Sequence, residues 1–77
     1  MREDFRIKLD LKDVPHFVAA ATSIDNPVNV VQGQSAISGK SLMGVMALNL
    51  SRPATLVVAN REDDDIVYEK FGQWVIN

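Results

Sequence analysis

The residue best placed to do chemistry is Ser41, which lies in a densely apolar stretch between Gly39 and Leu50. Gly39 gives the backbone freedom for a turn, and a serine hydroxyl can cap a helix by accepting a hydrogen bond from a free backbone N–H. The apolar residues from Leu42 onward are compatible with a helix over 41–50. A phosphate on Ser41 would lie at the positive end of that helix, which favours an anion. Ser41 is therefore a candidate cap and a candidate phosphorylation site.

His16 is the only histidine in the chain and hence the only imidazole that could carry a phosphoryl group. It follows Pro15 in the first turn of a predicted helix, near backbone N–H groups that favour an anion. Asp10 and Asp13 lie close by in the sequence, and their charges would repel a phosphate. The sequence leaves two alternatives open, a phosphoacceptor and an ordinary first-turn residue.

The remaining polar residues form no recognisable catalytic set. Asp63, Asp64 and Asp65 are consecutive, so on a helical turn they point in different directions, and they lack the Gly and Glu spacing of a calcium loop. We interpret them as the solvated start of a helix. Without a Ser-His-Asp set, a Gly-rich phosphate loop or a metal-ligand cluster, the sequence predicts no enzyme, no bound metal and no cofactor.

The stretch around Ser41 carries more apolar surface than one buried helix face needs. We expect Met43 and Met46 to be exposed together with Leu42, because flexible methionines suit a surface that repacks against several partners. The alternative is that all of them belong to the core, since a domain this small needs its apolar residues. The residues that could fill the core side instead are Val45, Leu48 and Leu50.

Hydrophobic periodicity predicts the elements that position these residues. Apolar and charged residues alternate strictly over 5–12, which is typical of a half-buried strand, and apolar residues recur at helical spacing from Val14 to Ala21 after the cap residue Asp13. A nearly continuous apolar run before Asn60 indicates a central strand. The predicted order is a strand over 5–12, a helix over 14–23, a hairpin of strands 28–32 and 35–38, a helix over 41–50, a strand over 54–60 and a helix over 63–76.

This order, βαββαβα, predicts an α+β fold in which three helices cover one face of a four-stranded antiparallel sheet. The strand over 54–60 lies inside the sheet, and the weak arm over 35–38 lies at its edge. The pattern alone does not separate this architecture from other ferredoxin-like domains.

The segment from Lys40 to Met46 resembles the Lys-Ser-Ile-Met-Gly-Val-Met signature of HPr, the phosphocarrier family of the bacterial sugar phosphotransferase system, and is nearly identical to it over seven residues. Without gaps the resemblance extends from about Val18 to Val58. It implies the HPr open-faced β-sandwich with sheet order one, four, two, three. It also implies that Ser41 is a regulatory site for a dedicated serine kinase, and that Lys40, Ser41, Leu42, Met43 and Met46 form a docking surface for protein partners.

The chain departs from the family at the carrier site. The family's carrier histidine opens the first helix in a His-Ala-Arg-Pro motif, and the ungapped alignment places that motif on residues 10–13, where no histidine stands. The arginine that helps to hold the phosphate would fall on Lys12, which lacks a bidentate fork. In this respect the chain is similar to the catabolite-repression HPr paralogue, a corepressor when its serine is phosphorylated.

Composition narrows the class further. With 77 residues there is room for one domain over 1–77, and the absence of cysteine agrees with a reducing cytoplasm. A net charge of −2 with scattered basic residues argues against nucleic acid as a partner. No apolar run approaches the ~20 residues of a membrane span, and the charged start from Met1 to Asp4 precedes no signal-peptide core. We therefore expect a cytoplasmic protein.

The sequence thus favours a non-catalytic HPr-like regulator that binds partners through the helix starting at Ser41 and is switched by phosphorylation there, in phosphotransferase-system or carbon catabolite regulation. The expected partners are the HPr serine kinase and a transcriptional regulator or phosphotransferase-system component. Two alternatives remain. The first is a phosphocarrier that uses His16, and the second is a constitutive binding or dimerisation module.

Overall fold

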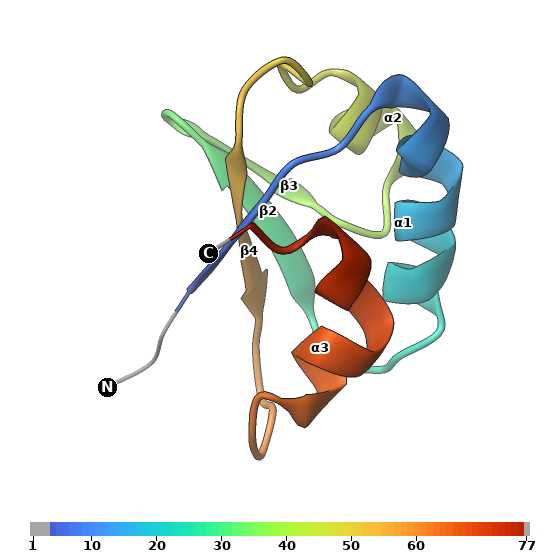
Figure 1. The fold of residues 1–77 in the computed structure, drawn as a ribbon, viewed down its shortest axis with the longest axis vertical. Helices are drawn as coiled ribbons and strands as arrows, with labels where there is room; N and C mark the ends of the chain where they lie inside the picture. Colours follow the sequence, from blue (N-terminus) through green and yellow to red (C-terminus); the bar gives the residue numbers. More distant parts are fainter. Residues whose placement is uncertain (1–3, 77) are drawn as a thin grey trace.

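The computed structural model describes residues 4–76, so the ends of the predicted 1–77 domain, residues 1–3 and 77, lie outside the described residues. Figure 1 shows the chain path. Two short 3-10 helices, η1 and η2, accompany the predicted elements. The elements in chain order are β1 (Phe5–Ile7), η1 (Leu11–Asp13), α1 (Val14–Thr22), β2 (Val28–Gln32), β3 (Ser35–Ser38), α2 (Leu42–Met46), β4 (Ala54–Val58), α3 (Asp65–Phe71) and η2 (Gly72–Trp74).

The four strands form one antiparallel sheet in the order β1-β4-β2-β3, which confirms the predicted topology. β4 lies between β1 and β2, where Leu56 is opposite both Phe5 and Val30. Alternate β4 residues are buried because a strand presents successive side chains to opposite faces. The short strand β3 forms the edge, as expected from its weak apolar pattern.

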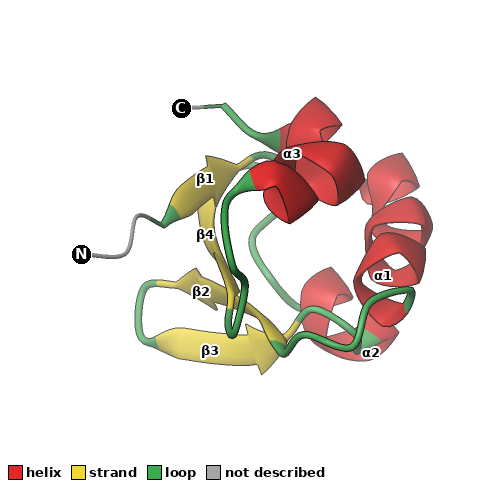
Figure 2. Ribbon diagram, turned by 90° about the horizontal axis from the view of Figure 1, so that it is seen from below, coloured by secondary structure: helices red, strands yellow, loops and turns green. Residues whose placement is uncertain are grey.

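All three α-helices cover the same face of the sheet, as Figure 2 shows, so the α+β open-faced sandwich is confirmed. In the core between the layers, aromatic rings from α1, α3 and η2 lie close to one another. The Phe17 ring centroid lies 5.2 Å from that of Phe71 and 5.5 Å from that of Trp74. Rings at this separation add attraction beyond the area that they bury. These contacts hold α1 and α3 together and leave α2 at one end of the helical layer (Figure 1).

The first strand is shorter than predicted, because the 5–12 alternation continues past the point where pairing stops. The register places Ile7 opposite Ala54, and the N–H of the next residue, Lys8, donates to the Trp74 carbonyl rather than to β4. Asp10 then turns the chain: its carbonyl accepts from the Asp13 N–H at 2.9 Å, and its N–H donates to the Asp13 carboxylate at 2.9 Å. The Asp13 side chain is thereby used in this turn and does not cap α1.

The helix predicted over 41–50 spans only Leu42–Met46. Side chains compete with the helical bonds after that point. The Gln32 side chain accepts from the Asn49 N–H at 2.8 Å, and the Asn49 side chain accepts from the Ser51 N–H at 3.1 Å. Such local bonds offer the backbone an alternative to the helix.

The last helix is also shorter than predicted over 63–76, and it ends at Phe71 before η2. Val75 does not continue the helix face but has extended backbone and forms a bridge with Ile7. The Lys8 N–H donates to the Trp74 carbonyl at 3.0 Å. The C-terminal segment thus covers part of the edge of β1.

Candidate functional site

Ser41 lies at the junction of β3 and α2, on the surface, and it caps α2. The Gly44 N–H donates to Ser41 Oγ at 3.1 Å, so the predicted cap is confirmed. The preceding turn is held by Gly39, whose N–H donates to the Val28 carbonyl at 2.7 Å. Gly39 is buried, and a Cβ there would lie 2.6 Å from Val28 Cγ1. The turn that presents Ser41 therefore needs glycine for close packing.

Lys40 is tied into the fold rather than extended into solvent. Its Nζ donates to the carbonyl oxygen of Ile24, just after α1, at 2.8 Å. Its N–H donates to Ser38 Oγ at 3.1 Å. A cation at this position satisfies a carbonyl at the C-terminal end of a helix. The geometry gives Lys40 a part in holding the turn before Ser41, and its contact with partners stays a prediction.

The apolar residues of α2 divide between core and surface. Val45 is fully buried, whereas Met43 is 83% and Met46 50% exposed, and Leu42 is exposed as well. Their predicted exposure is confirmed, and the alternative that all of them are core is wrong. We call Leu42, Met43 and Met46 the α2 surface. Such a group of flexible apolar side chains fits a docking role.

A further exposed apolar residue, Leu11, was not foreseen. The strand pattern assigned it to the buried face, but it opens η1 and is 64% exposed. Figure 1 draws η1, by its place in the chain colours just before α1, at the same end of the molecule as α2. The signal that would have revealed it is the pair Asp10 and Asp13, whose spacing is typical of a turn before a helix.

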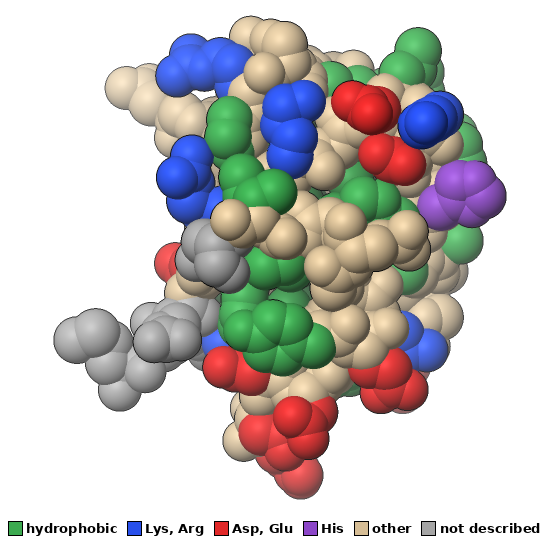
Figure 3. Space-filling model, in the orientation of Figure 1, with side chains coloured by type: hydrophobic (Ala, Val, Ile, Leu, Met, Phe, Trp, Pro, Cys, Tyr) green, Lys and Arg blue, Asp and Glu red, His purple; other side chains and the backbone are tan. Residues whose placement is uncertain are grey.

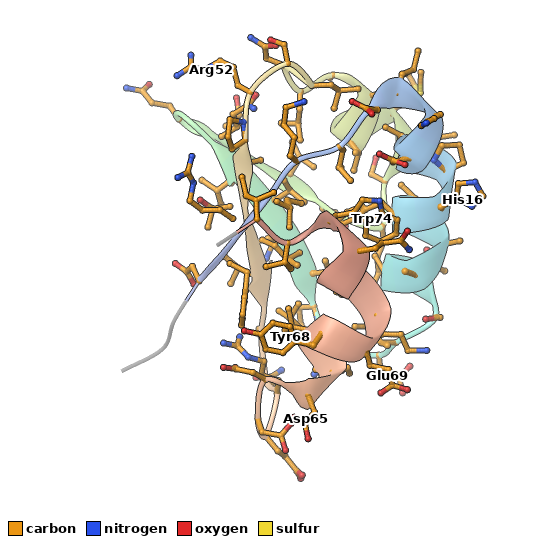
Figure 4. The ribbon with its side chains drawn as sticks, viewed as in Figure 1. His16, Arg52, Asp65, Tyr68, Glu69 and Trp74 are labelled. Carbon is orange, nitrogen blue, oxygen red and sulfur yellow. The ribbon has the colours of Figure 1, made fainter. Side chains whose placement is uncertain are left out.

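His16 lies in the first turn of α1, after Pro15, as predicted. It is exposed, and its side chain points away from the body of the molecule (Figure 4). In Figure 3 it lies at the rim, with hydrophobic side chains on both sides of it. Residues 10–13, where the resemblance places the family's carrier motif, form the approach to this helix instead. The structure brings no arginine to His16 by any hydrogen bond or ion pair among the described residues.

The acidic residues before α3 lie far from α2, at the lower end of the molecule in Figures 3 and 4. Asp64 pairs with Arg61 at 2.9 Å, and the Asp63 carboxylate accepts from the Asp65 N–H at 3.0 Å. Within residues 4–76 no three acidic, histidine or cysteine side chains are grouped to hold a metal ion. These aspartates therefore serve the start of α3.

The comparisons assign the chain to a family. The family model described as PTS HPr component phosphorylation site matches residues 8–75, which is most of the chain. Together with the fold, this shows that the protein belongs to the HPr family of phosphocarrier proteins of the sugar phosphotransferase system. No curated protein and no solved structure matches the chain. None of the helices in the described part is long and apolar enough to cross a bilayer.

Proposed function

We propose that this HPr-family protein is a non-catalytic cytoplasmic regulator that docks on protein partners through the α2 surface and is switched by phosphorylation of Ser41. The observation that carries the proposal is the exposure of Met43 and Met46 beside an exposed Ser41, within an element whose Val45 is fully buried. Leu42 completes the surface. Large apolar side chains exposed together cost solvation and favour a covering partner.

The expected partners are the serine kinase of the family and a transcriptional regulator or another phosphotransferase-system protein. Leu11 in η1 extends the docking area, because η1 lies at the same end of the molecule as α2 (Figure 1). A phosphate on Ser41 adds close to two negative charges to this area, so it changes which partners fit. A partner with arginines would gain from the phosphate, and an acidic one would be repelled.

The absence of a histidine on residues 10–13 supports a regulatory role over a carrier role. The alternative carrier, His16, has Asp10 and Asp13 in the turn that leads into its helix. These carboxylates oppose the approach of a phosphoryl donor by charge.

The docking proposal is tested by measuring how tightly the HPr serine kinase binds two variants, each substituted at a residue with about the same exposed fraction. Met46→Asp places a charge on the α2 surface, at a residue that is 50% exposed. Ile76→Asp is the control, because it places the same charge in the C-terminal segment at a residue that is 52% exposed. We expect Met46→Asp to weaken binding by about 30-fold, as for a central interface residue, and Ile76→Asp to leave it unchanged. Equal binding of both variants would show that the α2 surface is not the docking site.

A further inference from the structure

Gly44 lies within α2 at a position where glycine is not required by the backbone. Among the described glycines only Gly33 has a positive φ, so Gly44 adopts ordinary helical geometry. In a helix glycine costs about 1 kcal/mol relative to alanine. Backbone conformation therefore does not explain why residue 44 is glycine.

The space around Gly44 supplies a reason. A Cβ at this position would lie 3.2 Å from Ser41 Oγ and 3.3 Å from Ser41 Cβ. The next atom, Ile37 Cβ, would lie 3.5 Å away, in ordinary contact. An added methyl group would therefore be tight only against Ser41, whose side chain would have to shift by a few tenths of an ångström. Since the Gly44 N–H also holds Oγ at 3.1 Å, glycine allows a close bond without covering the hydroxyl.

We infer that Gly44 is a specificity-determining residue for the modification of Ser41, because it keeps Oγ open to the phosphoryl donor. The inference rests on the proposed function. In the transfer, Ser41 Oγ bonds to the γ-phosphorus of ATP, the bond from that phosphorus to the β,γ-bridging oxygen breaks, and ADP leaves. The hydroxyl proton passes to a basic group of the kinase. This step needs an unobstructed line to Oγ, and misplacement of a reacting atom lowers the rate steeply.

Steady-state phosphorylation by the HPr serine kinase with ATP tests the inference on the full chain. We expect Gly44→Ala to lower kcat by about tenfold or more, with KM changed by less than about twofold, because the α2 surface is retained. Gly72→Ala is the matched control, since a Cβ there meets its nearest side-chain atom, Tyr68 Cβ, only at 4.0 Å. Melting temperatures and amide spectra of both variants should show the wild-type fold, because alanine favours helix.

The outcomes separate the two proposals. If the wild-type chain is not modified at Ser41, the proposed switch is wrong, and the role of Gly44 is wrong with it. If the wild-type chain is modified and Gly44→Ala keeps the same kcat, only the role of Gly44 is overturned. An equal loss of kcat in Gly72→Ala, or unfolding of Gly44→Ala, also contradicts the inference.

Discussion

Ser41 combines two properties in one side chain, since its hydroxyl caps α2 and is exposed to solvent. The cap was predicted from its place before an apolar run. The space around Gly44 was not predicted, because it depends in part on Ile37 in β3. Local sequence therefore identifies the reactive group, and the fold determines how accessible it is.

Replacing the cap should affect stability measurably but modestly. We expect Ser41→Ala to lower the free energy of unfolding by about 1 kcal/mol, whereas Ser41→Asp should keep most of it, because aspartate caps as well as serine. Urea unfolding of the two variants measures the difference. Ser35→Ala, at an exposed position of the edge strand, is the control and should match the wild type. An Ala variant as stable as the Asp variant would mean that the 3.1 Å bond to Oγ contributes little.

Charge substitutions along α2 should separate surface from core. Met43→Asp and Met46→Asp should change the unfolding free energy by no more than about 0.5 kcal/mol, as is usual at surface sites. Val45→Asp should unfold the protein, because it places an unpaired carboxylate in the core at a cost of several kcal/mol. Thermal melts of the three variants provide the comparison. If all three lose their transition together, Met43 and Met46 are not free for docking.

At the scale of elements, the sequence predicts the identity and order of the strands and helices but not all of their ends. Periodicity suffices for β4 and α1, where the apolar repeat reflects burial against the sheet or the helices. The errors occur where distant residues act on the chain. The Trp74 carbonyl accepts the Lys8 N–H after β1, Gln32 binds the backbone at Asn49 after α2, and Ile7 forms a bridge with the extended Val75. None of these contacts is visible in a local window of sequence.

The turn between β3 and α2 should depend on Gly39. An alanine there would place its Cβ 2.6 Å from Val28 Cγ1 and 3.4 Å from the Phe17 ring, so strand and helix would have to separate. We expect Gly39→Ala to cost about 1 to 3 kcal/mol, as overpacking does in cores. Chemical denaturation measures it. Gly72→Ala, whose Cβ would meet Tyr68 Cβ only at 4.0 Å, should be neutral or slightly stabilising. Equal effects of the two variants would be inconsistent with this packing.

At the scale of the whole molecule, the sheet and the aromatic core hold α2 at one end of the helical layer, with the acidic start of α3 at the other (Figures 1 and 3). The family signature lies at the α2 end, and Leu11 is a further exposed apolar residue that the strand pattern had assigned to the buried face. The chain belongs to the phosphocarrier family, and residues 10–13, where the resemblance places the family's carrier motif, contain no histidine. The molecule is therefore expected to receive phosphate at Ser41 rather than at His16.

Intact mass after two separate incubations tests this claim most directly. With the HPr serine kinase and ATP, we expect one added phosphate on the wild-type chain and none on Ser41→Ala. With Enzyme I and phosphoenolpyruvate, we expect no change of mass, because Asp10 and Asp13 flank the approach to the helix that carries His16. The contradicting result is a phosphate added by Enzyme I that disappears in His16→Ala, together with a wild-type chain that the kinase leaves unmodified.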